Sequence, residues 1–175
     1  ARTSTDTDKH EHIFAEIVST IGRMGLSVSI EPLISLLYDL LEDKRKSDYV
    51  EEALRKIGEA VIEPILKALE KDELGEFEHR LLYVLAIVGS DAKDERIYRI
   101  LRKAFRESVD KLPVVVCLAA YKDGRAVPML RSYLEKNGRE IPKQLFYTVM
   151  DTVSRLGGDI KDFMGMFREM DSKKA

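Results

Sequence analysis

The chain contains 175 residues, of which 45% are hydrophobic and 34% are charged, and its formal net charge at pH 7 is −2. This length suits one domain with a continuous core, and the near-neutral charge gives no general argument for binding to nucleic acid or to an anionic membrane. The single cysteine excludes an internal disulfide, and no hydrophobic run approaches the ~20 residues of a membrane span, so we expect a cytoplasmic protein.

A succession of amphipathic helices is predicted along the whole chain after a polar start. Residues 1–9 are rich in Thr and Asp, which is typical of a disordered tail. Beyond them, hydrophobic residues recur at spacings of three and four. The helices that this spacing predicts cover about 10–24, 30–41, 48–57, 60–71, 76–88, 91–105, 112–121, 127–136, 142–156 and 160–170. The run 114–116 consists of β-branched valines, but its register matches the other helices, so we expect no strand.

Glycines and capping residues set the expected helix ends. Gly25, Gly58, Gly89 and Gly157 each follow a hydrophobic stripe, where a left-handed C-terminal residue is common. The helix beginning near 48 is expected to be capped by Ser47 or Asp48, and the helix beginning near 91 by Ser90 or Asp91.

Aligning these helix ends reveals an internal repeat. The aligned column contains Gly25, Gly58, Gly89, Lys122 and Gly157, separated by 33, 31, 33 and 35 residues. Positions one, four, five and eight residues before the column are hydrophobic or small in every copy, which predicts a buried stripe. The members eight residues before the column are Ile17, Val50, Leu81, Val114 and Val149. A helix pair that recurs with a period near 33 is typical of an α-solenoid.

The repeat divides the chain into predicted segments. We expect a single domain over 10–171, with helix pairs at about 26–58, 59–89, 90–122 and 123–157, a C-terminal cap helix at 159–170 and a tail at 172–175. The helix over 10–24 matches the second helix of a pair, yet no first helix precedes it. It is either an N-terminal cap or the remnant of a repeat from a longer parent protein.

Prolines distinguish among the solenoid classes. Pro32, Pro64 and Pro128 occupy equivalent places in three first helices, and the segment 123–130 reads Asp-Gly-Arg-Ala-Val-Pro-Met-Leu. This pattern resembles the short HEAT-like repeats that are also found in phycobilisome lyases, over about residues 13–156. The resemblance implies an all-α, right-handed α-α superhelix of about four helix pairs, a fold usually used to bind other macromolecules.

Residues with catalytic chemistry are sparse. His10 and His12 lie near the N-terminus and His79 near a helix start, without the spacing of three or four that metal ligands on a helix favour. HEAT-like iron hydroxylases carry repeated His-Glu pairs, whereas only His10-Glu11 matches here. Cys117 falls in the small-residue column and is interpreted as a buried structural residue. We therefore expect no catalytic residue, metal or cofactor, and no enzyme activity.

A hydrophobic strip on the inner helices is the first candidate binding surface. Positions two and six residues before the aligned column normally line the concave side of such a fold, and in the middle repeats they are apolar. The candidate partner-binding residues are Tyr83, Ile87, Val116 and Ala120, with Arg80, Lys56 and Arg155 at the rim together with Arg23 and Asp151. An exposed apolar patch with a polar rim indicates a protein partner or a homodimer, although strong curvature could bury the strip instead.

A basic ridge on one outer helix is the second candidate. Its residues recur at spacings of three and four and are Arg96, Arg99, Lys103 and Arg106. Such a ridge could contact phosphates, and some HEAT-like proteins bind DNA, including a family of alkylpurine glycosylases. Acidic neighbours and the lack of interleaved aromatic residues favour a solvated outer face.

Three functions follow from these surfaces. The leading hypothesis is a non-enzymatic scaffold that binds a protein or peptide through its inner helices. The second is nucleic-acid binding through the ridge, which the near-neutral charge disfavours. The third is a lyase-like or chaperone-like role, which rests only on the resemblance to phycobilisome lyases.

Overall fold

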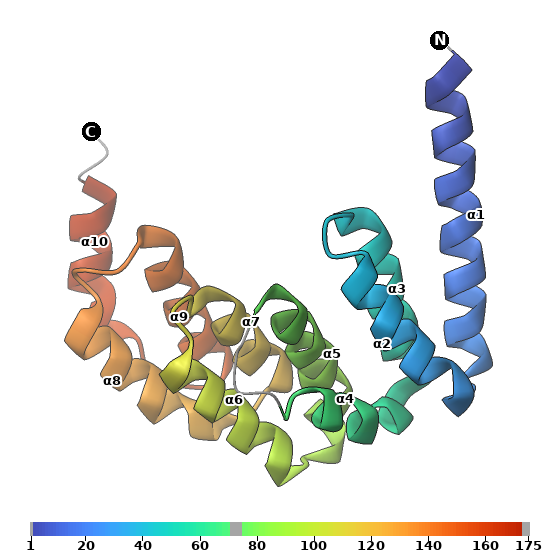
Figure 1. Ribbon diagram of the computed structural model, residues 1–175. Coiled ribbons are helices and arrows are strands. Elements are labelled where there is room, and N and C mark those ends of the chain that lie inside the picture. Colours follow the sequence, from blue (N-terminus) through green and yellow to red (C-terminus); the bar gives the residue numbers. More distant parts are fainter. Residues whose placement is uncertain (1, 71–74, 173–175) are drawn as a thin grey trace. The chain divides into compact units, whose positions relative to one another are not determined.

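The computed structural model describes residues 2–70 and 75–172, and these residues form α-helices, short 3₁₀ helices and turns, with no strand among them (Figure 1). The predicted all-helical class is therefore confirmed. The chain divides into two compact units, and the boundary lies between Ala92 and Lys93. The single repeat domain expected over 10–171 stays a prediction. The predicted loop residues 72–74 and the tail residues 173–175 lie outside the described part of the chain.

The first unit is organised around one central helix. Its elements are α1 (Arg2–Met24), the 3₁₀ helix η1 (Ser27–Ser29), α2 (Ile30–Asp39), α3 (Lys44–Ile57), η2 (Gly58–Val61), α4 (Ile62–Ala68) and α5 (Glu76–Ala92). Helix α3 packs against α1, α2 and α5, and α4 packs against α2 and α5. The predicted pairing of each first helix with the second helix that follows it is therefore present as α2 with α3 and as α4 with α5.

The second unit has the same local pairing. Its elements are α6 (Glu95–Glu107), α7 (Leu112–Tyr121), η3 (Gly124–Ala126), α8 (Val127–Asn137), α9 (Lys143–Arg155), η4 (Lys161–Phe163) and α10 (Met164–Ser172). Helix α7 packs against α6 and α9, and α8 packs against α9. The C-terminal α10 contacts α9 through Phe167, whose ring lies 5.0 Å from that of Tyr147.

Left-handed residues end the second helices at nearly all of the predicted positions. Positive φ angles occur at Gly25 (64°), Gly58 (80°), Lys122 (57°) and Gly157 (84°), which belong to the aligned column. The exception is Gly89: α5 continues through it to Ala92, and the left-handed residue is Lys93 with φ of 51°. A glycine alone does not end a helix when the next residues can continue it.

Two of the expected N-terminal caps are wrong. Helix α6 is capped by Asp94, whose side chain accepts from the backbone N–H of Arg96, because α5 extends past Ser90 and Asp91. Helix α3 is capped by Asp43, whose carboxylate accepts from Lys46 N at 3.2 Å and also pairs with the Lys46 ammonium at 2.8 Å. In both places the capping aspartate combines a backbone hydrogen bond with a side-chain ion pair, although Asp43 lies before the predicted caps and Asp94 lies after them.

The N-terminal segment also differs from its prediction. A disordered tail was expected over 1–9, but α1 begins at Arg2. Residues 2–9 contain neither glycine nor proline, so nothing in them interrupts a helix that continues from the hydrophobic part of α1.

The predicted stripe is buried in α3, α5, α7 and α9 at positions four, five and eight before the aligned column, whereas one residue before it only Tyr121 is buried and Ile57, Val88 and Leu156 are half-buried. Residues eight positions before the aligned column, such as Val50 and Leu81, are fully buried in these four helices, and Cys117 in the small-residue column is buried as expected. Helix α1 departs from the pattern, because its equivalent residues Ile17 and Met24 are 56% and 60% exposed. The stripe therefore forms the core where a first helix covers it, and α1 has no such cover among the described residues.

Gly22 sets the distance between α1 and α3. A Cβ atom at this position would lie 2.7 Å from the Ala53 Cα and 2.9 Å from the Ala53 carbonyl oxygen, closer than packed atoms approach. The obstacle is backbone, which cannot rotate away as a flexible side chain could. Gly22 thus allows α1 and α3 to pack with their backbones nearly in contact.

The substitution Gly22→Ala tests this contact. Alanine favours the helix by about 1 kcal/mol, but the added methyl group must push α1 away from α3, so we expect a net loss of about 1–3 kcal/mol in the free energy of unfolding. The matched control is Gly165→Ala in α10, where an added Cβ meets nothing within 4 Å. Urea unfolding followed by circular dichroism measures both, and a stabilised Gly22→Ala variant would contradict the close packing.

Candidate interaction surfaces

Three helices of the first unit, each matching the second helix of a repeat pair, expose a common side, which we call the α1–α3–α5 face. Helices α1 and α5 both pack on α3, and the positions two and six residues before the aligned column lie on this side. The residues that define the α1–α3–α5 face are Ser19, Arg23, Glu52, Lys56, Tyr83 and Ile87. Its composition changes from polar on α1 and α3 to apolar on α5.

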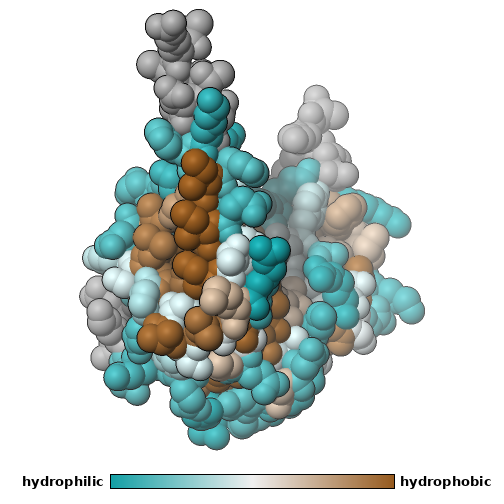
Figure 2. Space-filling view, turned by 90° about the vertical axis from the view of Figure 1, so that its right-hand side faces the viewer, coloured by the Kyte–Doolittle hydropathy of each residue, from teal (hydrophilic) through white to brown (hydrophobic). Residues whose placement is uncertain are grey.

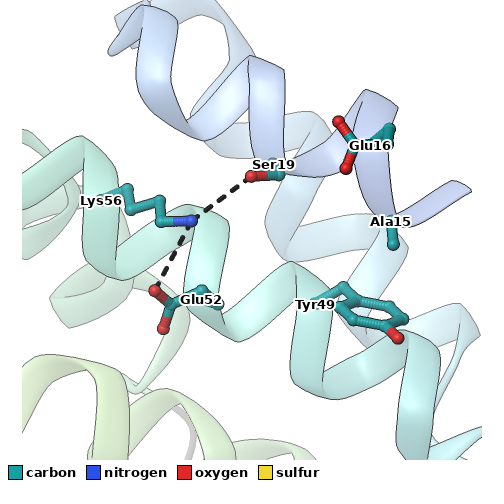
Figure 3. A pocket seen from close by; sticks show the side chains of 6 residues that line it. All are labelled: Ala15, Glu16, Ser19, Tyr49, Glu52 and Lys56. Carbon is teal, nitrogen blue, oxygen red and sulfur yellow. Dashed lines mark hydrogen bonds and ion pairs between the residues drawn. The ribbon is translucent and has the colours of Figure 1, made fainter. Parts of the chain in front are cut away.

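The polar part of the face holds a pocket of about 300 Å³ between α1 and α3 (Figure 3). Its lining residues are Ala15, Glu16, Ser19, Tyr49, Glu52 and Lys56. The Lys56 ammonium lies 3.3 Å from the Ser19 hydroxyl and 3.6 Å from the Glu52 carboxylate, so it bridges the two helices. Helical spacing also places Tyr49 on this side of α3, a position that the inner-face pattern alone did not single out.

The apolar part of the face is held in place by an arginine from α3. Tyr83 and Ile87 are half-buried in α5. The Arg55 guanidinium lies 5.8 Å from the centre of the Tyr83 ring and donates a 2.5 Å hydrogen bond to Glu52. This contact favours the observed orientation of the tyrosine ring and leaves part of the ring accessible.

Arg80 is predicted at the exposed rim of the hydrophobic strip, but its side chain is mostly buried in the structure. Its side chain, only 13% exposed, pairs with Glu51 of α3, lies 3.3 Å from Asp48 and lies 3.7 Å from Glu76. Burial raises the pKa of the Glu51 carboxyl even with the guanidinium beside it. Arg80 therefore links α5 to α3 inside the unit, and the residues left for a partner on this face are Lys56, Tyr83 and Ile87.

The other half of the predicted strip belongs to the second unit. Val116 of α7 is 41% exposed and Ala120 is half-buried. Arg155 of α9 is exposed and pairs with Asp151 at 3.6 Å. None of the four strip residues is fully buried, but they are divided between two units, and their union into one continuous strip stays a prediction.

The basic ridge lies along the exposed side of α6, and acidic side chains accompany it. Arg96 donates to Asp94 at 2.7 Å, and Lys103 lies 3.8 Å from Glu107. Arg99 and Arg106 are also exposed. Because two of the four cations are paired with carboxylates, the ridge has less net positive potential than its sequence alone indicates.

Comparisons of the chain with protein-family models, with curated proteins and with solved structures found no match. The site must therefore be interpreted from its own residues. Within the described ranges 2–70 and 75–172, no cluster of three or more His, Cys, Asp or Glu residues is placed to hold a metal ion. In the same part of the chain, no helix combines the length and the hydrophobicity needed to cross a membrane.

The structure adds a surface that the two candidate patches do not include. Ile13, Ile17 and Met24 lie along one side of α1 and are all more than half exposed. The sequence contained the signal for it, since α1 matches a second helix and lacks a first helix. Only solvent exposure in the structure distinguishes an uncovered stripe from one buried against another part of the chain.

The ion pair between Arg80 and Glu51 gives a test of the α3–α5 contact. The substitution Arg80→Met leaves the Glu51 carboxylate buried without its cation, so we expect the free energy of unfolding to fall by about 3 kcal/mol at neutral pH. The loss should shrink in acid, because protonated Glu51 no longer requires a counter-charge.

The matched control is the double variant Glu51→Gln plus Arg80→Met, which removes both charges and should recover part of the lost stability. Chemical unfolding of the three proteins across pH measures these differences. A loss in Arg80→Met that is independent of pH and equal in the double variant would show that the ion pair does not hold α5 on α3.

Proposed function

We propose that the protein is a non-enzymatic scaffold, built as a HEAT-like α-solenoid, that binds a protein partner through the α1–α3–α5 face. The observation that carries the proposal is the pair Tyr83 and Ile87, two partly accessible hydrophobic residues where α1 and α3 have polar ones. A partly accessible tyrosine beside an aliphatic residue is typical of the anchor region of an interface.

The surroundings of this pair define the partner's chemistry. A helix or extended peptide would place hydrophobic side chains over Tyr83 and Ile87. The pocket between α1 and α3 carries two carboxylates, Glu16 and Glu52, and one ammonium, Lys56, which already contacts Ser19 and Glu52, so the pocket favours a basic or hydrogen-bonding group of the partner. Charged residues at the edge of the anchor favour orientation and specificity more than affinity.

The double substitution Tyr83→Asp plus Ile87→Asp tests the proposal. Both side chains are only half-buried, so we expect the variant to fold, with helical content close to that of the natural sequence by circular dichroism. Two carboxylates in the anchor region should lower capture of the partner at least about 10-fold, because the contact loses apolar area and gains charges that must be desolvated. Quantitative mass spectrometry after affinity capture from cells measures this change.

The control is the double substitution Val28→Asp plus Val109→Asp, which adds the same charges at residues that are 79% and 102% exposed and outside the α1–α3–α5 face. It should capture partners as the natural sequence does. If every protein captured by the natural sequence were retained equally by the folded Tyr83→Asp plus Ile87→Asp variant, this face would not be the binding surface.

A further inference from the structure

The second candidate surface is the uncovered side of α1, and it differs from the α1–α3–α5 face. In α3, the stripe residues Val50 and Leu54 are both fully buried. Their equivalents in α1 are Ile17 and Ile21, and Ile17 is 56% exposed. Helix α1 thus keeps the hydrophobic residues of a covered helix, although no described part of the chain covers it.

The uncovered residues form a continuous apolar column. Figure 2 shows hydrophobic surface running along α1 below its grey end, with further hydrophobic surface beside it on one side and hydrophilic surface on the other. Ile13 and Met24 are 54% and 60% exposed and lie on the same side of the helix as Ile17. Exposed apolar surface bordered by polar residues marks interaction sites on folded proteins. An apolar outer side on α1 indicates an occupant.

The spacing of the column matches a helix–helix seam. Residues 10, 13, 17, 20 and 24 follow one another at intervals of three, four, three and four, which is the heptad spacing of residues that face a partner helix. The hydrophobic members are Ile13, Ile17 and Met24. The seam spans 15 residues, or about 20 Å of helix at the 1.5 Å rise per residue.

The charged residues beside the seam have opposite signs and would pair with each other between two copies related by a two-fold rotation. Glu16 and Arg23 are exposed on the same flank of the seam, seven residues apart. Arg23 also donates a 3.0 Å hydrogen bond to Thr20 Oγ1. In an antiparallel pair of identical helices, flanking residues one heptad apart face each other. Glu16 would then meet Arg23 of the other helix twice, whereas in a parallel pair this flank would face the opposite flank of the other helix, so Glu16 would lie against Ile21 and gain no ion pair.

We propose that α1 pairs with α1 of a second copy of this chain, antiparallel and about a two-fold axis. Ile13 faces Met24 of the second copy, Ile17 faces Thr20 of the second copy, and Glu16 bonds to Arg23 of the second copy. Phe14 and Ile21 extend the apolar contact on the opposite flank. One surface serves both copies, as an isologous dimer requires; of the α1–α3–α5 face it takes up Arg23 and the pocket residue Glu16, and it leaves Tyr83 and Ile87 uncovered.

Sedimentation velocity over a range of protein concentrations tests the dimer. We expect the natural sequence to dimerise and Ile17→Glu to weaken dimerisation by about 100-fold or more, because the two-fold axis removes two buried isoleucines at once. Met24→Glu is a second variant at an equally exposed position, in case Ile17→Glu affects folding. The matched control is Val28→Glu, an exposed hydrophobic residue outside the seam, which should dimerise as the natural sequence does.

A charge exchange tests the antiparallel orientation. Glu16→Arg places arginines opposite each other and should weaken the dimer by about 10-fold, whereas Glu16→Arg combined with Arg23→Glu should restore it. A chain that remains monomeric at the highest concentrations would overturn the proposal. So would a dimer that persists in both Ile17→Glu and Met24→Glu, or a charge exchange that fails to restore association.

The two proposals fail separately. A dimer that is lost in Tyr83→Asp plus Ile87→Asp but kept in Ile17→Glu would form through the α1–α3–α5 face, which overturns the pairing of α1. Loss of partner capture with an intact α1 dimer leaves both proposals standing.

Discussion

The rest of the structure depends on one interaction: burial of the hydrophobic stripe on the second helix of each pair. Helix α3 shows it most fully, since Val50, Ala53 and Leu54 are completely buried and helices α1, α2 and α5 surround it. Gly22 lets α1 approach the backbone of Ala53, and Arg80 links α5 to α3 through Glu51. Close packing of this kind is sensitive to single methyl groups, because the interior contains little free volume. An apolar stripe without a cover therefore has a cost, and it points to an interaction with another molecule.

Turns with left-handed residues bring consecutive helices into these contacts. Gly25, Gly58 and Gly157 adopt positive φ without steric cost, whereas Lys93 and Lys122 adopt it against the preference of residues with a Cβ atom. The second unit compensates with local bonds around the two lysines. Tyr121 donates to the carbonyl of Asp94 at 2.9 Å, and Lys93 donates to the carbonyl of Lys122 at 3.5 Å. A non-glycine turn is thus held by its neighbours, which is why the helix-end pattern survives the loss of its glycine.

Two surfaces of the first unit remain open after the stripes are covered, and their chemistry differs. The α1–α3–α5 face combines a polar pocket around Lys56 with the partly accessible ring of Tyr83, which suits a partner that presents both apolar groups and basic or hydrogen-bonding groups. The seam on α1 is more apolar and is flanked by Glu16 and Arg23, which suits an identical helix. The first surface would select a different protein, and the second would join two copies and so present two α1–α3–α5 faces to that protein. Two linked binding sites raise the effective affinity for a partner that can reach both.

Hydrophobic spacing in the sequence was enough to predict the helices and most of the core, because a helical stripe repeats every 3.6 residues whatever it packs against. The range predicted for α7 agrees with the structure, and the stripe residues four, five and eight positions before the aligned column are buried in α3, α5, α7 and α9. The helix ends depended on competition between nearby capping residues. Helix α6, for example, is capped by Asp94 and not by the predicted Ser90 or Asp91. Arg80 pairs with Glu51, about thirty residues away in the chain, and the exposure of Ile17 depends on which helices cover α1. Local sequence could predict neither. A stripe of isoleucines has the same sequence pattern whether another helix covers it or solvent surrounds it, and only the tertiary structure decides between these two states.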